Sequence, residues 1–253
     1  MDRVEKTNEK VEELFHQPAA GEGGSDGEFM QILQRYIFGE LCFTGSLDNR
    51  MRELVTITVL TTIQALPQLK APLNAGLNVG CTPVELREAV YQCAPFIGFP
   101  RTLNAIGVLN EVLTDRGVSL PLPKQGTVAD EERYEKGLAL QIPVYGDEIK
   151  GRYTWLPKPC NEAVPRFLTE HCFGDFNTRT GLDQKTRELL TVVLLAALGG
   201  AEVQVKSHVA GALKTGSTKE EVVCALVHAS AYMGIPRLFN ALNTCKELLS
   251  ENQ

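Results

Sequence analysis

Three polar side chains in the second half of the chain have types and spacing that suit acid–base chemistry. Gln204 and His208 lie four residues apart, so a helix would place both side chains on one face. Glu188 lies near the start of the preceding predicted helix, among leucines and valines. A histidine can give or take a proton near neutral pH, and a carboxylate beside it can orient the imidazole. Glu188 and His208 are therefore candidate catalytic residues, and Gln204 is a candidate for binding substrate.

Each of these residues also has a structural interpretation. A carboxylate in the first turn of a helix can simply face the positive end of the helix dipole. A single histidine on a half-apolar helix is more often hydrogen-bonded within the fold than catalytic. Two weaker candidates for substrate binding are the hydroxyl of Tyr232 and the guanidinium of Arg237. Arg237 begins a predicted helix, where a cation either binds an anion or pairs with a carboxylate such as Glu221.

The elements that must position these residues form an internal repeat. The matching segments are Phe38-Gly39-Glu40 with Phe173-Gly174-Asp175, Arg52-Glu53-Leu54 with Arg187-Glu188-Leu189, and Gly98-Phe99-Pro100-Arg101 with Gly234-Ile235-Pro236-Arg237. Such a repeat indicates a duplicated fold. The copies differ chemically, because the second carries His208 where the first carries Pro72. A structural histidine should be needed twice, whereas a catalytic one need survive only once. We therefore expect the site in the second copy, and a closed or inert region around Glu53, Gln68 and Pro72 in the first.

Hydrophobic spacing and capping signals predict an all-α fold. The expected helices cover residues 28–38, 50–66, 68–79, 82–97, 100–114, 129–140, 184–198, 201–215, 219–233 and 236–250, while 142–159 reads as irregular. Residues 50–66 are apolar nearly all round, which predicts a buried helix. We divide the chain into a first unit, residues 1–118, and a second, residues 119–253, which includes the linker.

Composition narrows the function classes. The net charge is −6 and no basic stripe is present, so nucleic acid is not an expected partner. No run of apolar residues is long enough to predict a membrane span, and the charged N-terminus does not resemble a secretion signal, so we expect a cytoplasmic protein. The seven cysteines lack C-x-x-C spacing, which argues against a disulfide framework or zinc cluster. We expect Cys81, beside a helix cap, to be the most exposed thiol.

At these residues the sequence resembles the carboxymuconolactone decarboxylase family, which shares its fold with alkylhydroperoxidase D. The resemblance covers about 38–113 and 173–249. It rests on Arg187-Glu188-Leu189, Gln204-x-x-x-His208, Gly216-x-Thr218-x-x-Glu221 and Tyr232-x-Gly234-x-Pro236. The chain looks like a tandem, two-unit member. The resemblance implies two copies of an alkylhydroperoxidase D-like helical unit, assembled as a homotrimer with pseudo-six-fold symmetry.

The family has two chemistries, which the resemblance separates. Its peroxidase branch has a C-x-x-C pair before the histidine, but Ala201 and Gln204 occupy those positions here, and Ala65 and Gln68 in the first unit. Its decarboxylase branch lacks the cysteines and keeps the histidine. We therefore predict a cofactor-free acid–base enzyme, with no metal, that acts on a small carboxylated lactone or related carbonyl acid. The alternatives are a thiol-dependent hydroperoxidase and a non-catalytic scaffold or small-molecule binding protein.

Overall fold

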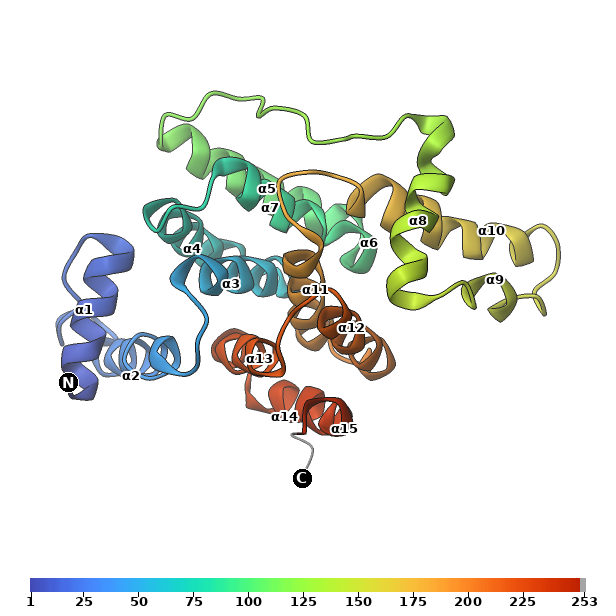
Figure 1. The fold of residues 1–253 in the computed structure, drawn as a ribbon. Helices are drawn as coiled ribbons and strands as arrows, with labels where there is room; N and C mark the ends of the chain where they lie inside the picture. Colours follow the sequence, from blue (N-terminus) through green and yellow to red (C-terminus); the bar gives the residue numbers. More distant parts are fainter. Residues whose placement is uncertain (251–253) are drawn as a thin grey trace.

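The computed structural model describes residues 1–250, and within that range the protein contains helices and no strand (Figure 1). This confirms the predicted all-α fold. The first unit contains α1 (Arg3–Phe15), α2 (Gly27–Ile37), η1 (Leu41–Phe43), α3 (Asn49–Ile63), α4 (Leu66–Asn78), α5 (Pro83–Tyr91), α6 (Ala94–Ile97) and α7 (Phe99–Asp115). The second contains η2 (Asp130–Glu132), α8 (Arg133–Tyr145), α9 (Ile149–Arg152), α10 (Cys160–Phe167), η3 (Leu168–Asn177), α11 (Gln184–Leu198), α12 (Glu202–Lys214), α13 (Lys219–Met233), α14 (Ile235–Thr244) and α15 (Lys246–Leu249). Among the described residues, no helix is both long enough and apolar enough to span a membrane.

Local signals fix the same helix starts in both units. Asp48 and Asp183 each accept a backbone N–H at the start of α3 and α11. Thr82 and Thr218 form capping boxes with the glutamate three residues later, which begin α5 and α13. Each cap satisfies N–H groups that the first helical turn leaves unpaired. The duplicated boundaries therefore follow from duplicated capping residues.

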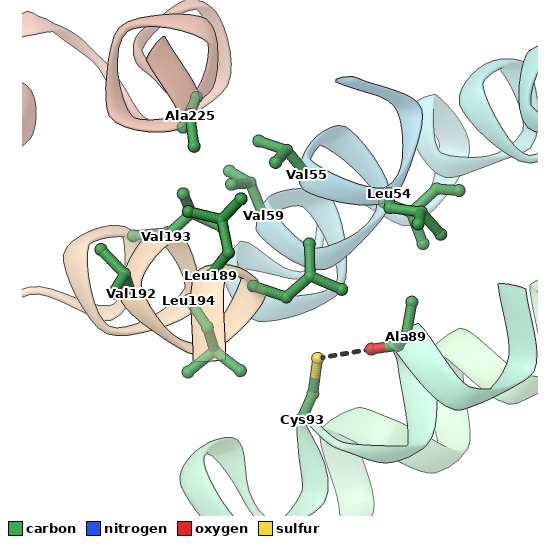
Figure 2. Close-up of a cluster of buried hydrophobic side chains, with 14 of the residues drawn as sticks. Leu54, Val55, Val59, Ala89, Cys93, Leu189, Val192, Val193, Leu194 and Ala225 are labelled. Atoms are coloured by element: carbon green, nitrogen blue, oxygen red, sulfur yellow. Dashed lines mark hydrogen bonds between the residues drawn. The ribbon is translucent and has the colours of Figure 1, made fainter. Parts of the chain in front are cut away.

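The two units share one hydrophobic core, with α3 and α11 at its centre. Both helices are buried on nearly every side, and side chains from both units join in one cluster. Figure 2 shows part of it, with Val55 and Val59 of α3 beside Leu189 and Val193 of α11. Each buried valine or leucine side chain contributes about 1.5–3 kcal/mol relative to an exposed one. The units therefore stabilise each other through these central helices.

A buried ion cluster also joins the units. The Glu88 carboxylate on α5 accepts two hydrogen bonds of 2.8 Å from Arg179 and one of 3.3 Å from Arg187 on α11. Glu88 and Arg187 are almost inaccessible to solvent, and a buried charge needs such compensation. This cluster fixes the end of α5 against α11, which matters for the cavity described below.

The predicted helix over 82–97 is interrupted. It ends at Tyr91, and a new short helix starts after a turn at Gln92. The cause is Pro95, which has no N–H to donate to the carbonyl of Tyr91. In the second unit Ala231 occupies the equivalent place and α13 continues without a break. Pro72, by contrast, lies inside α4, which continues to its end at Asn78.

The segment before the second repeat is more helical than predicted. Helix α8 continues to Tyr145, α9 lies within the stretch expected to be irregular, and residues 160–177 form α10 and the π-helix η3. Helices α8 and η3 pack backbone to backbone, because a Cβ atom on Gly137 would lie 2.8 Å from the nitrogen of Gly174. The extended chain between α7 and α8 crosses the molecule and brings this pair beside α6 (Figure 1). Phe99 of α7 accordingly contacts the ring of His171 in η3.

Candidate active site

A cavity of about 470 Å³ is lined by Glu188, Gln204 and His208, the three residues that we expected to share one pocket. Much of its wall is apolar. Those apolar residues come from α6, the α8–α9 segment and η3, and are Pro95, Phe96, Val144, Ile149, Tyr153, Leu168, Phe173 and Phe176. Two exposed cations, Arg152 and Lys214, also line it. An apolar cavity with a few polar groups is the usual form of a small-molecule site.

The polar centre of the cavity is a three-membered hydrogen-bonded cluster. The hydroxyl of Tyr145 donates to Oε2 of Glu188 over 2.5 Å. Nδ1 of His208 lies 2.9 Å from that oxygen and 2.7 Å from the hydroxyl oxygen of Tyr145. All three atoms are therefore mutually within hydrogen-bond distance.

The protons of this cluster can be assigned from its partners. Burial, and then the charge of Glu188, hold the pKa of Tyr145 far above its usual value, so the phenol keeps its proton. That proton is donated to Glu188, so the phenol oxygen and the carboxylate both face Nδ1 of His208 as acceptors. Nδ1 of the neutral imidazole therefore carries the hydrogen, and Nε2 keeps its lone pair. His208 can take up and release a proton at Nε2.

The surrounding elements hold this cluster rigidly. Glu188 is 3% exposed on the buried helix α11, and Tyr145 is the last residue of α8. Helix α12 can approach because Gly211 has no side chain: a Cβ there would overlap the Tyr145 hydroxyl and lie 3.0 Å from Oε2 of Glu188. The ring of Phe96 packs edge-on against His208 with centroids 5.7 Å apart. The first unit thus supplies part of the cavity wall next to the imidazole.

Tyr145 was not among the predicted site residues, although the sequence carries a signal for it. Arg3-Val4-Glu5-Lys6 at the start of α1 recurs as Arg133-Tyr134-Glu135-Lys136 at the start of α8. Both helices are 13 residues long, which aligns Phe15 with Tyr145. The structure supports this alignment, because the ring of Phe15 packs on Phe38 as that of Tyr145 packs on Phe173.

The corresponding position in the first unit lacks two of the three groups. Glu53 is buried at the place of Glu188, but Pro72 replaces the imidazole and Phe15 replaces the phenol. Without these partners, burial raises the pKa of Glu53 to about 8. This carboxyl therefore holds its proton in the folded protein at neutral pH, and the first unit has no matching proton relay.

This assignment predicts a pH-dependent stability difference for Glu53→Gln. The unfolded chain releases the Glu53 proton near pH 4.5 and the folded chain near pH 8, so wild-type stability falls as pH rises through that window. The fall is at most about 1.4 kcal/mol per pH unit from one group. The variant should lack this component in urea unfolding at pH 5 and pH 7.5, whereas exposed Glu131→Gln should keep the wild-type slope. Parallel slopes for wild type and Glu53→Gln would contradict the assignment.

Two predicted binding residues lie outside the cavity. Tyr232 packs on His228 with ring centroids 5.9 Å apart, and its hydroxyl lies near Glu53 of the first unit, whose charge adds to burial in raising the Tyr232 pKa. Arg237 donates to the carbonyl of Ala197 and lines a separate cavity of about 130 Å³. The suggested pairing of Arg237 with Glu221 does not form, because Glu221 pairs with Lys185 instead. Neither Tyr232 nor Arg237 is brought to the Glu188–His208 pair.

The cysteines do not form a redox pair. All seven are free thiols. The expectation that Cys81 is the most exposed was wrong: it is buried, and Cys160 is the exposed one. Cys172 lines the cavity, but burial raises its pKa to about 11, which keeps the thiol protonated and weakly nucleophilic. Within residues 1–250, no three His, Cys, Asp or Glu side chains converge as metal ligands would.

The sequence pattern of the carboxymuconolactone decarboxylase family matches residues 27–111 and 162–247. The chain belongs to this family. The two matches confirm the predicted tandem arrangement, with one family unit on each side of the linker. The family unit thus contributes α11 and α12, which carry Glu188 and His208, whereas Tyr145 lies outside both matched segments.

Two decarboxylases and one solved structure are similar to the chain. The 4-carboxymuconolactone decarboxylase of Acinetobacter baylyi is 30% identical over 122 residues, which cover 48% of this chain and 90% of the relative. The nitrosuccinic acid decarboxylase of Metarhizium robertsii is 27% identical over 118 residues, which cover 47% and 82%. A solved structure from Burkholderia xenovorans LB400, named for a gamma-carboxymuconolactone decarboxylase subunit, superposes with a TM-score of 0.54 at 23% identity and covers 98% of both chains. That likeness supports the fold of the whole tandem chain.

Proposed function

We propose that the protein is a cofactor-free decarboxylase that acts on a small carboxylated lactone or related carbonyl acid. The observation that carries this proposal is the Tyr145–Glu188–His208 cluster, which presents one imidazole nitrogen to an apolar cavity. The names of the relatives from Acinetobacter and Metarhizium support the reaction class, because both are decarboxylases of a small acid. A cytoplasmic location belongs to the same proposal.

The reaction needs a proton donor and a place for the electrons that the departing CO₂ leaves behind. Cleavage of the carbon–carboxylate bond leaves an electron pair, which an adjacent lactone or carbonyl group can hold as an enolate. His208, protonated at Nε2 from solvent, then gives that proton to the carbon, so that a carboxylate and a proton become CO₂ and the C–H product. Glu188 stabilises the imidazolium at Nδ1, and Tyr145 holds the carboxylate in place.

Other polar groups on the cavity wall suit the binding of such an acid. The Gln204 amide can donate to a lactone or carbonyl oxygen. Lys214 donates to the carbonyl of Val144 over 2.7 Å, which fixes its ammonium near the end of α8. Arg152 is a second exposed cation on the wall and Glu148 is an exposed carboxylate, so these three groups carry a net positive charge that attracts a carboxylate.

The direct test is CO₂ release by the purified protein from 4-carboxymuconolactone and from nitrosuccinic acid. We expect turnover of at least one of them without added metal or cofactor, and a rate lower by about 10²–10⁴-fold for a His208→Ala variant. Consumption of hydrogen peroxide or an organic hydroperoxide at the expense of a thiol, without CO₂ release, would overturn the proposal in favour of a hydroperoxidase. Binding without any turnover would favour a non-catalytic binding protein. The protonated, unpaired Cys172 gives no support to the thiol chemistry.

The proposed homotrimer is supported by a duplicated apolar surface. Phe99 and Leu103 at the start of α7 are exposed, and so are Ile235 and Phe239 at the same positions of α14. In a ring with pseudo-six-fold symmetry each unit would use the same patch, which explains why both units keep it.

We expect light scattering to give the mass of a trimer for the wild type and a smaller mass for Phe99→Asp combined with Phe239→Asp. A charge in such a patch is costly to bury, so association should weaken. Trp155→Asp is the matched control, because that aromatic side chain is also exposed but has no counterpart in the repeat. A monomeric wild type at micromolar concentration would contradict the assembly.

A further inference from the structure

Gln92 is an unexplained polar residue in the wall of the cavity. Its side chain is 3% exposed, and neither the amide oxygen nor the amide nitrogen has a hydrogen-bond partner in the protein. The residue nevertheless lines the same cavity as Glu188 and His208. A buried amide that makes no hydrogen bond destabilises a folded protein, so such a group calls for an explanation.

Two features hold the backbone at Gln92 in position. Glu88 lies one helical turn earlier on the same face, and its carboxylate accepts hydrogen bonds from Arg179 and Arg187 of the second unit. Helix α5 ends just before Gln92, and Pro95 lies in the first turn of α6, so Gln92 lies in the turn between the two helices. The backbone on both sides of Gln92 is therefore held in place at the cavity wall.

The equivalent residue in the other unit shows what a satisfied side chain looks like at this place. His228 aligns with Gln92, and its Nε2 lies 3.0 Å from the hydroxyl of Thr56. Burial lowers the pKa of His228 to about 3, so its ring is neutral and structural. The aligned threonine on the Gln92 side is Thr191, which lines the cavity and donates to the carbonyl of Arg187 as Thr56 donates to that of Arg52, but which makes no hydrogen bond to Gln92. Of the two aligned side chains, only Gln92, which lies beside the Tyr145–Glu188–His208 cluster, lacks a hydrogen-bond partner.

We propose that Gln92 is a substrate-binding residue that the first unit contributes to the active site of the second. Its Nε2 donates to a carbonyl oxygen of the substrate, and its Oε1 accepts from a hydroxyl group or an ordered water. The ligand class is an acid with a second oxygen function, such as a lactone, beside the carboxylate that leaves. This inference deepens the proposed function and rests on it for the choice of ligand. It also gives the first unit, which lacks a proton relay of its own, a role in recognition.

The experiment compares two ring acids by isothermal titration calorimetry: a saturated γ-lactone carboxylate and cyclopentanecarboxylate, which has the same ring size without the lactone oxygens. We expect the wild type to prefer the lactone. Gln92→Met, which keeps the length of the side chain without its polar atoms, should lose that preference about tenfold, the effect of one hydrogen bond. The same variant should melt at a higher temperature, because it removes the unpaired amide. Gln92→Leu is a second variant in case methionine packs poorly.

Thr58→Val is the matched control. The Thr58 hydroxyl is also buried and unpaired, but it does not line the cavity. This variant should gain stability and bind both acids as the wild type does. Unchanged lactone preference in both Gln92 variants, or a wild type that does not distinguish the two acids or binds neither, would overturn the inference. A wild type that prefers the lactone through Gln92 but releases no CO₂ would overturn only the proposed function.

Discussion

Replacement of His208 by alanine is expected to lower CO₂ release by a factor of about 10²–10⁴, the usual effect of removing a general acid–base residue. The reason is geometric. His208 is the member of the cluster whose second ring nitrogen is left free by the bonds to Glu188 and Tyr145. Without it the cavity keeps its walls and Gln204, so substrate should still bind while kcat falls.

The control for this prediction is Gln68→Ala. Gln68 aligns with Gln204 in the first unit, is exposed, and lies outside the cavity. It should leave kcat and KM within a factor of about two, because surface substitutions away from special features have small effects. Circular dichroism and the melting temperature of His208→Ala would show whether the fold survives. A correctly folded His208→Ala with wild-type turnover would return this histidine to a structural role.

The sequence was most informative where the repeat and the capping residues agree. Helix α3 could be located from a stretch that is apolar nearly all round, α11 from the repeat, and α5 and α13 from their capping boxes. The four-residue spacing of Gln204 and His208 also indicated that their side chains lie together, and both line one cavity. These features depend on local physics, namely side-chain periodicity and unpaired backbone groups at helix ends.

The sequence was least informative where one unit completes the site of the other. Tyr232 lies in the same unit as His208, but its side chain lies near Glu53 of the first unit. The Tyr232 hydroxyl therefore cannot reach the imidazole. The first unit instead supplies Phe96, which packs against His208, and Gln92, which lines the same cavity. A sequence motif within one unit does not predict that the other unit contributes to its site. That contribution depends on how α3 and α11 pack.

The wall formed by η3 was missed for a different reason. A π-helix bonds residue i to residue i+5, so its side chains do not follow the spacing by which α-helices are recognised. The start of α8 repeats the start of α1, but the spacing to the rest of the repeat differs between the units, which hid the match of Tyr145 with Phe15. The missed residue is the one that completes the cluster.

Tyr145→Phe tests whether that hydroxyl is needed. Hydrogen bonds to charged groups contribute about 1.5–3 kcal/mol, so loss of the donor to Glu188 should lower kcat by about 10- to 100-fold. KM should change little, because the phenyl ring still fills the same part of the wall. If kcat stays within a factor of about two, the phenol is only a packing residue.

The opposite substitution, from phenylalanine to tyrosine, can be made at the matching position of the first unit. Phe15→Tyr puts a hydroxyl at the matching place beside Phe38, where Glu53 is present but the histidine is replaced by Pro72. It should add no turnover, and a Tyr145→Phe/Phe15→Tyr double variant should be as slow as Tyr145→Phe alone. This outcome is expected because the hydroxyl acts through the imidazole: it accepts from Nδ1 of His208 while it donates to the carboxylate. A hydroxyl and a carboxylate without the imidazole have no group that can carry the proton to substrate. Recovery of turnover in the double variant would show instead that the first unit retains an active site of its own.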